Sequence, residues 1–256
     1  MTSVIAMAEA GIGRITLNRP EHLNAVNVEL AVELERALRL LGSNPAVHVI
    51  LVHGAGGNFC AGGDFAEVER LRGEGAAALS TLFEAFRRAC DAIATIDVPV
   101  VAAVEGVAAA GGFELLQAAD IVLVSDDARI ADNHIRFGMI PGGGSTQRLP
   151  RLVGSQQAMG LLLSGDRLSG ADAARLGLAY RSFPPSEFEQ ATERFAATMA
   201  GHERSALVAI KRLVISGLHK PLTAGLDDEL VAVVDHISEG AGRNGASAFG
   251  QRGGNQ

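Results

Sequence analysis

Two glycine-rich loops, each placed between a buried strand and a helix, constrain the fold of this chain more than any other feature. The apolar run VHVILVH, residues 47–53, leads into GAGGNFCAGGD and then into helical sequence that begins near Phe65. The run VPVVAAV, residues 98–104, leads into EGVAAAGG, residues 105–112, and a second helix near Gly112. Strands that alternate with helices predict βαβ units, and therefore an α/β fold with a largely parallel sheet. Both loops are then expected at the edge where the parallel strands end.

The rest of the pattern fits this architecture. Two short strands open the chain, and Asn27 is expected to cap a helix that has its leucines on one face and that Gly42 ends. From Ser155 onward the pattern is mainly helical. We therefore predict a core over residues 1–200 and a C-terminal helical segment over residues 201–256, which packs on the sheet or on a neighbouring subunit.

Charge and composition exclude several classes of protein. The net charge of −7 argues against non-specific binding to nucleic acid or to an anionic membrane. No run of apolar residues is long enough to span a membrane, and the N-terminus lacks the features of a signal peptide. The two cysteines, Cys60 and Cys90, form no disulfide framework, which favours a reducing compartment. The histidines are scattered without ligand spacing, so no metal site is expected. We predict a cytoplasmic protein.

The glycine loops do not match the common nucleotide sites. Position 59 is Phe where a G-x-G-x-x-G fingerprint needs glycine, and no G-K-[ST] occurs. The sequence HGAGG, residues 53–57, is like the oxyanion loop of lipases, but the G-x-S-x-G elbow of an α/β-hydrolase is missing. Both interpretations are therefore weak.

A shared anion site fits the loops better. Gly63 and Gly111 could each present one unpaired backbone N–H to the same carbonyl oxygen, because glycine lets a ligand approach the backbone closely. Two such N–H groups form an oxyanion hole, which stabilises an enolate or a tetrahedral oxyanion. Glu114 lies about one helical turn beyond Gly111 and is expected close to the bound group.

The chain as a whole resembles the crotonase superfamily, which is the enoyl-CoA hydratase/isomerase family. The likeness runs from about residue 3 to at least residue 215, with its motifs in the family's order. The matching segments are LNRPEHLNAVN (17–27), GNFCAGGDF (57–65), VPVVAAVEGVAAAGGFELLQAADIVLVSD (98–126), FGMIPGGGSTQRLPRLVG (137–154) and LSGDRLSGADAARLGL (163–178).

The resemblance implies a ββα spiral fold with a C-terminal helical trimerisation subdomain, and a homotrimer or a dimer of trimers. It implies an acyl-CoA thioester as substrate, no separate cofactor, and a carbonyl held by the N–H groups of Gly63 and Gly111. The turn at Gly142 is expected to bring its segment against the thioester. Further contacts to the substrate and its CoA moiety are implied for His22, Ala25, Ala61, Asp64, Phe65, Lys211 and Phe249.

The catalytic pair departs from the family pattern at one position. Glu114 occupies the place of the first glutamate, three residues after the second oxyanion glycine. The second glutamate of the family is expected seven residues before Pro141, where this chain has His134. A histidine titrates near neutral pH and could serve as acid or base. Alternatively, His134 is a structural residue that hydrogen-bonds the Asp132–Asn133 turn.

Hydration of a 2-enoyl-CoA to a 3-hydroxyacyl-CoA is the predicted activity. Isomerisation of an enoyl-CoA, decarboxylation and thioester hydrolysis remain open, because one oxyanion hole serves all of them. A non-catalytic acyl-CoA-binding subunit is the alternative from another class. His53, Asp64, Asp120 and Cys60 are interpreted as structural residues, in hydrogen bonds, loop shaping or packing.

Overall fold

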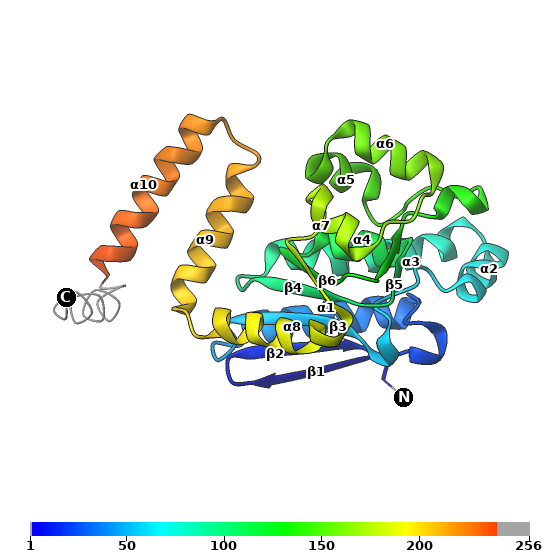
Figure 1. Cartoon of the computed structure of the whole chain (residues 1–256), viewed down its shortest axis with the longest axis horizontal. Helices are drawn as coiled ribbons and strands as arrows, with labels where there is room; N and C mark the ends of the chain where they lie inside the picture. The colour runs from blue at the N-terminus through cyan, green and yellow to red at the C-terminus, as the bar shows by residue number, and fades with distance from the viewer. Residues whose placement is uncertain (1, 240–256) are drawn as a thin grey trace. The chain divides into compact units, whose positions relative to one another are not determined.

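A computed structural model describes residues 2–239 of the chain. The chain divides into two compact units, Met1–Gly201 and His202–Gln256, and each has its own internal packing. The first unit holds both sheets and both glycine-rich loops. The predicted α/β class is confirmed by this unit (Figure 1).

The main sheet has six strands in the order β1-β2-β3-β4-β6-β8. Only β1 (Val4–Glu9) and β2 (Ile12–Leu17) pair antiparallel, as a hairpin whose turn residues Ala10 and Gly11 both have positive φ. The parallel strands that follow are β3 (Val49–Gly54), β4 (Val100–Val104), β6 (Ile121–Ser125) and β8 (Arg181–Phe183). The predicted, largely parallel sheet is confirmed.

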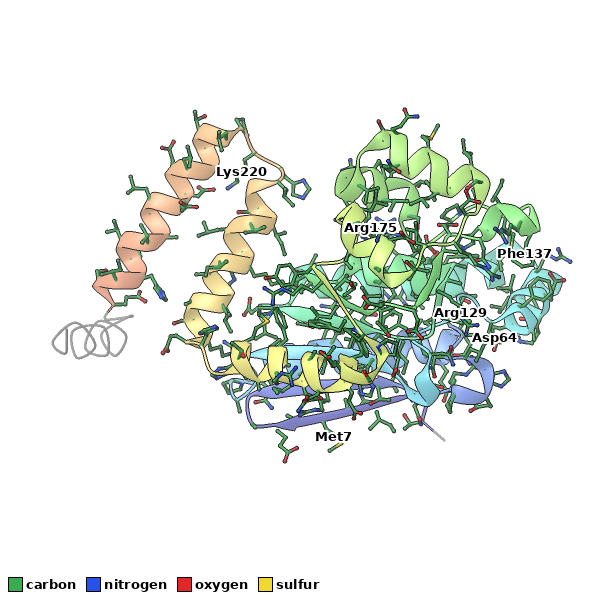
Figure 2. All side chains as sticks on the ribbon, viewed as in Figure 1. Met7, Asp64, Arg129, Phe137, Arg175 and Lys220 are labelled. Carbon is green, nitrogen blue, oxygen red and sulfur yellow. The ribbon has the colours of Figure 1, made fainter. Side chains whose placement is uncertain are left out.

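Strand β3 shows how the sheet is buried on both faces. Val49 and Leu51 belong to an apolar cluster that includes Phe188 of α8 (Pro185–Ala200), and α8 contacts β2, β3 and β6. The opposite face carries Val52, next to side chains from three further helices: α1 (Val28–Ser43), α3 (Ala76–Thr95) and α4 (Gly111–Ala118). Side chains fill the space between these layers (Figure 2). A strand covered on both faces is apolar throughout, which explains the continuous run in the sequence.

Helix α1 begins as the sequence predicts and ends one residue later. The Asn27 side chain accepts a hydrogen bond from the N–H of Leu30, which caps the helix. Gly42 is inside the last turn instead of ending the helix. A Cβ built at Gly42 would lie 2.8 Å from Cβ of Ile96, so glycine is needed here for packing and not for termination.

The two glycine loops meet beyond the strand ends, as predicted. The first joins β3 through the short 3-10 turn η2 (Ala55–Gly57) to α2 (Phe65–Glu74), and the second joins β4 through β5 (Val107–Ala109) to α4. Cys60 and Ala108 form a parallel bridge between them. Strand β5 also pairs with β7 (Arg129–Ala131) in a small second sheet.

The remaining elements of this unit surround the loops and the sheet. They are η1 (Pro20–His22), η3 (His134–Phe137), α5 (Ser145–Val153), α6 (Ser155–Ser164) and α7 (Gly170–Leu176). Helix α5 and strand β8 were not expected from the sequence, which indicated a mainly helical pattern only from Ser155 onward.

The second unit contains two adjacent helices, α9 (Arg204–Gly217) and α10 (Leu222–Ser238). Within the described part of the chain, α10 buries none of its residues. Among residues 2–239, no helix combines the length and apolarity that crossing a membrane requires.

Candidate active site

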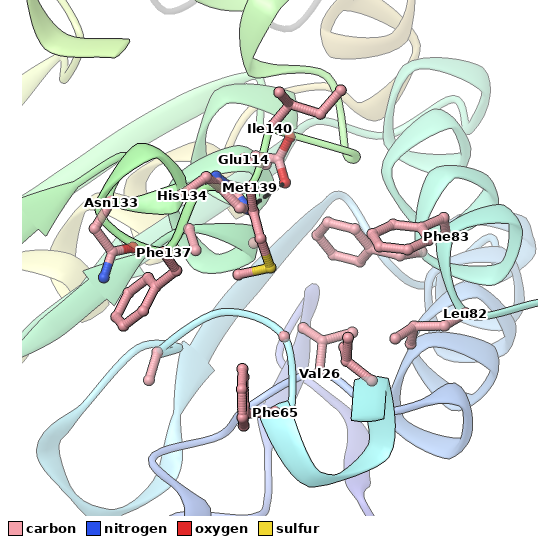
Figure 3. A pocket seen from close by; sticks show the side chains of 16 residues that line it. Val26, Phe65, Leu82, Phe83, Glu114, Asn133, His134, Phe137, Met139 and Ile140 are labelled. Atoms are coloured by element: carbon pink, nitrogen blue, oxygen red, sulfur yellow. Dashed lines mark ion pairs between the residues drawn. The ribbon is translucent and has the colours of Figure 1, made fainter. Parts of the chain in front are cut away.

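A pocket of about 290 Å³ opens where the two glycine loops meet the segment after β7. Gly63, Gly111, Glu114 and His134 all line it, so the structure brings the four principal candidates to one cavity. Figure 3 shows Glu114 and His134 beside each other on one side of this pocket. Apart from Asn133, its other lining residues are apolar: Val26, Ala61, Phe65, Val68, Leu82, Phe83, Phe86, Ala110, Phe137, Met139 and Ile140.

Glu114 lies in the first turn of α4 and is only 2% exposed. Its Oε1 accepts hydrogen bonds from the backbone N–H of Gly143 at 2.6 Å and of Ser145 at 3.2 Å. Burial raises the pKa of this carboxyl, and the two N–H donors together with His134 offset only part of that effect. Glu114 is therefore a held, partly desolvated carboxyl with its Oε2 free to face the pocket, as a general acid or base requires.

His134 opens the η3 turn, with its side chain 12% exposed. Its Nδ1 lies 2.7 Å from Oδ1 of Asp132, and its Nε2 lies 3.9 Å from Oε2 of Glu114. Burial lowers the pKa of the imidazole, but Asp132 and Glu114 raise it more, so the net shift is upward. The sequence suggested either a hydrogen bond to the turn or a place in the site. Nδ1 makes the contact to the turn, at Asp132, while Nε2 faces Glu114 at the pocket.

The backbone segments at Gly63 and Gly111 lie close together, and among the described residues their N–H groups have no acceptor. The position that a Cβ would take on Gly111 lies 3.5 Å from the backbone nitrogen of Gly63. Within residues 2–239, neither the N–H of Gly63 nor that of Gly111 donates to a protein acceptor. Gly111 is also the first residue of α4, where N–H groups have no partner inside the helix. The pair can therefore bind an oxygen that enters the pocket.

Ala110 holds Gly111 in place at a conformational cost. Its φ of 46° and ψ of −115° lie in a region that residues with a Cβ rarely adopt. Two hydrogen bonds fix it there: its N–H donates to the carbonyl of Ala131, and its carbonyl accepts from the N–H of Glu114. Strain of this kind is characteristic of positions that aim a backbone group into a site.

We expect Ala110→Gly to raise the free energy of unfolding by about 1 kcal/mol, because relief of left-handed strain exceeds the entropy that glycine adds to the unfolded chain. Chemical denaturation measures the difference. Ala109→Gly is the matched control, since Ala109 lies in β5 without a positive φ, and the same change there should lower stability. Equal effects at the two positions would contradict strain at Ala110.

Several predicted substrate contacts lie near the ion pair between Arg19 and Asp64. Arg19 donates to Oδ2 of Asp64 at 2.8 Å and to the carbonyl of Ala25 at 2.5 Å. Oδ1 of Asp64 accepts from the N–H groups of Ala66 and Glu67 and so caps α2. This confirms the structural role expected for Asp64. Ala61 and Phe65 line the pocket, whereas His22 lies on the exposed η1 turn.

Among the remaining candidates, Gly142 is not part of the pocket lining. Gly142 packs against Phe83, because a Cβ there would lie 2.6 Å from that ring. Lys211 belongs to α9 in the second unit and is buried. Phe249 lies outside the described residues.

The sequence analysis named only Ala61 and Phe65 among the residues of the apolar wall. It missed Leu82, Phe83 and Phe86, which line the pocket from one face of α3. The spacing of these three positions is that of one helix face. Phe137 faces them from η3 and stands at the rim, 64% exposed (Figures 2 and 3).

Other residues that attract attention in the sequence are structural. Burial raises the pKa of the Cys60 thiol to about 12, so it is no nucleophile at neutral pH. His53 hydrogen-bonds Thr16 across β2 and β3, and Asp120 accepts from the N–H of Val100. Among the residues that the structure describes, no group of three or more potential ligands could hold a metal ion.

The α/β fold and the pocket, with its buried carboxyl and its unpaired backbone N–H groups, are features of an enzyme. Comparisons with known proteins agree with this interpretation. The family model for enoyl-CoA hydratase/isomerase matches residues 7–255. The chain therefore belongs to the enoyl-CoA hydratase/isomerase family.

Individual relatives cover nearly the whole chain. The chain is 33% identical to the mitochondrial enoyl-CoA hydratase of Pongo abelii, over 93% of this chain and 80% of that protein. It is 31% identical to a peroxisomal Delta(3,5)-Delta(2,4)-dienoyl-CoA isomerase of Arabidopsis thaliana, over 86% of this chain and 82% of the isomerase. The crystal structure of an enoyl-CoA hydratase from Bacillus anthracis superposes with a TM-score of 0.92 at 28% identity, covering 98% and 96% of the two chains.

Proposed function

We propose that this enzyme hydrates a 2-enoyl-CoA to a 3-hydroxyacyl-CoA. The observation that carries the proposal is the single pocket in which Gly63, Gly111, Glu114 and His134 converge. The N–H groups of Gly63 and Gly111 form the oxyanion hole for the thioester oxygen, which makes C3 electrophilic and stabilises the enolate. The apolar walls receive the acyl chain.

Proton transfer in this proposal uses the two side chains in opposite senses. Glu114, as a carboxylate, accepts a proton from the water whose oxygen adds to C3. His134, as an imidazolium, delivers a proton to C2, so that one water is added across the double bond. Return of the proton from Glu114 to His134 restores the starting state, and their atoms are 3.9 Å apart. Positioned groups of this kind contribute about 10²- to 10⁴-fold each to a rate.

A panel of acyl-CoA thioesters tests the proposal. We expect the 2-enoyl-CoAs to lose the ultraviolet absorbance of the conjugated thioester and to yield 3-hydroxyacyl-CoA by mass spectrometry. A 3-enoyl-CoA should remain unchanged in the same assay. Conversion of the 3-enoyl-CoA with inert 2-enoyl-CoAs would replace hydration by isomerisation, a second candidate that is favoured by the likeness to the Arabidopsis isomerase.

Several further properties are part of the proposal. The reaction needs no cofactor besides the CoA carried by the substrate, and the buried, unpaired thiols of Cys60 and Cys90 support a cytoplasmic setting. Assembly into a homotrimer or a dimer of trimers is supported by the exposed apolar residues of α10, which include Leu222, Leu226, Leu230 and Val234. Lys211 and Phe249 are proposed to contact the CoA moiety.

A further inference from the structure

Asp132 is a buried carboxylate next to the proposed acid/base pair. It directly follows β7 and is 1% exposed. Its Oδ1 lies 2.7 Å from Nδ1 of His134 and 3.4 Å from the backbone N–H of the same residue. Its Oδ2 is buried without a hydrogen-bond partner among the described residues, and His134 is the one side chain in residues 2–239 that pairs with it. A charge in this environment is stable only beside a donor or a cation.

The short contact decides which ring nitrogen carries hydrogen. An ionised carboxylate can only accept, so Nδ1 of His134 must be the donor. Nε2 is then the nitrogen that exchanges a proton. It points to Oε2 of Glu114 at 3.9 Å, while Oε1 of Glu114 is held by Gly143 and Ser145 (Figure 3). Oε1 of Glu114 and Nδ1 of His134 are thus held by their hydrogen-bond partners. The other two atoms, Oε2 of Glu114 and Nε2 of His134, face each other.

We infer that Asp132 is a positioning residue, which binds Nδ1–H of His134 and thereby holds Nε2 toward Glu114 and the substrate. The inference rests on the proposed function, because it assigns the role of Asp132 within that same proton transfer. Asp132 is not part of the pocket lining, and in this proposal it acts through His134 alone.

The surrounding charges favour the same arrangement. Asp132 and Glu114 face the imidazole from two sides and favour its cation, the form that delivers a proton. Arg136, on the same turn, lies against Gly165 after α6. Arg148 of α5 donates to the carbonyl of Gly143. The Cys90 thiol of α3 is neutral, because burial raises its pKa to about 12. Among the described residues around His134, the carboxylates of Asp132 and Glu114 are therefore the charges that determine whether its imidazole is protonated.

Nitrogen-15 NMR of the unsubstituted protein provides the first test. We expect the neutral form of His134 to be the Nδ1–H tautomer, with a titration midpoint above that of an exposed histidine. His53 serves as the internal reference for a histidine without a carboxylate partner, because it is bound to a threonine hydroxyl. A neutral His134 with hydrogen on Nε2 would overturn the inference without any variant.

Asp132→Asn provides the second test. The variant keeps the shape and removes the charge, so the midpoint of His134 should move to lower pH. The alkaline limb of kcat/KM for a 2-enoyl-CoA should move the same way. Asp132→Ala, which frees the ring, should lower kcat by about 10²-fold with little change in KM. Asp120→Asn is the matched control, since Asp120 caps a backbone N–H of β4 away from the pocket, and its profile should not move.

The two readouts separate this inference from the proposed function. An unmoved His134 midpoint and an unmoved alkaline limb in Asp132→Asn would make Asp132 merely structural. A shifted midpoint in a protein that hydrates no 2-enoyl-CoA would retain the pairing and reject hydration, because the NMR titration requires no turnover.

Discussion

Glu114→Gln is expected to lower kcat for hydration by about 10³-fold while the dissociation constant for a CoA thioester changes little. The amide oxygen of glutamine can still accept from the N–H groups of Gly143 and Ser145, so the side chain should stay in place. What is lost is the carboxylate that accepts the proton of water. Stopped-flow kinetics and calorimetric titration with a non-reactive acyl-CoA measure the two quantities separately.

The same variant has two further consequences that a misfolded protein would not show. The Glu114 charge is one cause of the raised pKa of His134, so that pKa should fall. The free energy of unfolding should stay the same or rise, because burial opposes ionisation of this carboxyl. Glu187→Gln, in the first turn of α8, is the control for loss of a glutamate elsewhere. Hydration by Glu114→Gln at the unsubstituted rate would contradict the role of Glu114.

The sequence predicts the elements with the strongest local signals. Asn27 marks the start of α1, a helix is predicted from near Phe65 where α2 begins, and the doubly buried strands appear as continuous apolar runs. Strand β8 was missed because three residues are too short to show a period. Helix α5 was missed because it contains Pro150, and proline in a helix interior argues against a helix.

The residues of the candidate site also divide into those that the sequence predicts and those that it does not. Glycines and charged residues that lie close to the loops, such as Gly63, Gly111 and Glu114, can be found by their spacing. The wall from α3 cannot, because its residues are ordinary core types whose position depends on how the helix packs. The double contact of His134 also depends on tertiary geometry. Only the η3 turn, which directs Nδ1 to Asp132 and Nε2 to Glu114, makes the two interpretations compatible.

Gly143 leaves no room for a side chain between Phe86 and Glu114. A Cβ at this position would lie 2.4 Å from Cε1 of Phe86 and 2.9 Å from Oε2 of Glu114. Phe86 is buried in the pocket wall, so neither neighbour can give way freely. We therefore expect Gly143→Ala to lower kcat/KM by about 10²-fold, through displacement of the carboxyl. We also expect it to lower the free energy of unfolding by about 1–3 kcal/mol, through overpacking.

Two companion variants make the origin of this effect measurable. Gly160→Ala, inside α6 with open space around its Cβ position, should raise the free energy of unfolding by about 0.5–1 kcal/mol and leave the rate unchanged. Phe86→Leu removes the nearest ring atom, so the double variant Gly143→Ala/Phe86→Leu should recover part of the stability lost in Gly143→Ala. Recovery of stability without recovery of rate would locate the remaining defect at Glu114, because the clash with its Oε2 persists after the ring is gone. Full activity of Gly143→Ala would show instead that Glu114 tolerates displacement, which a proton-transferring group held by two backbone N–H donors should not.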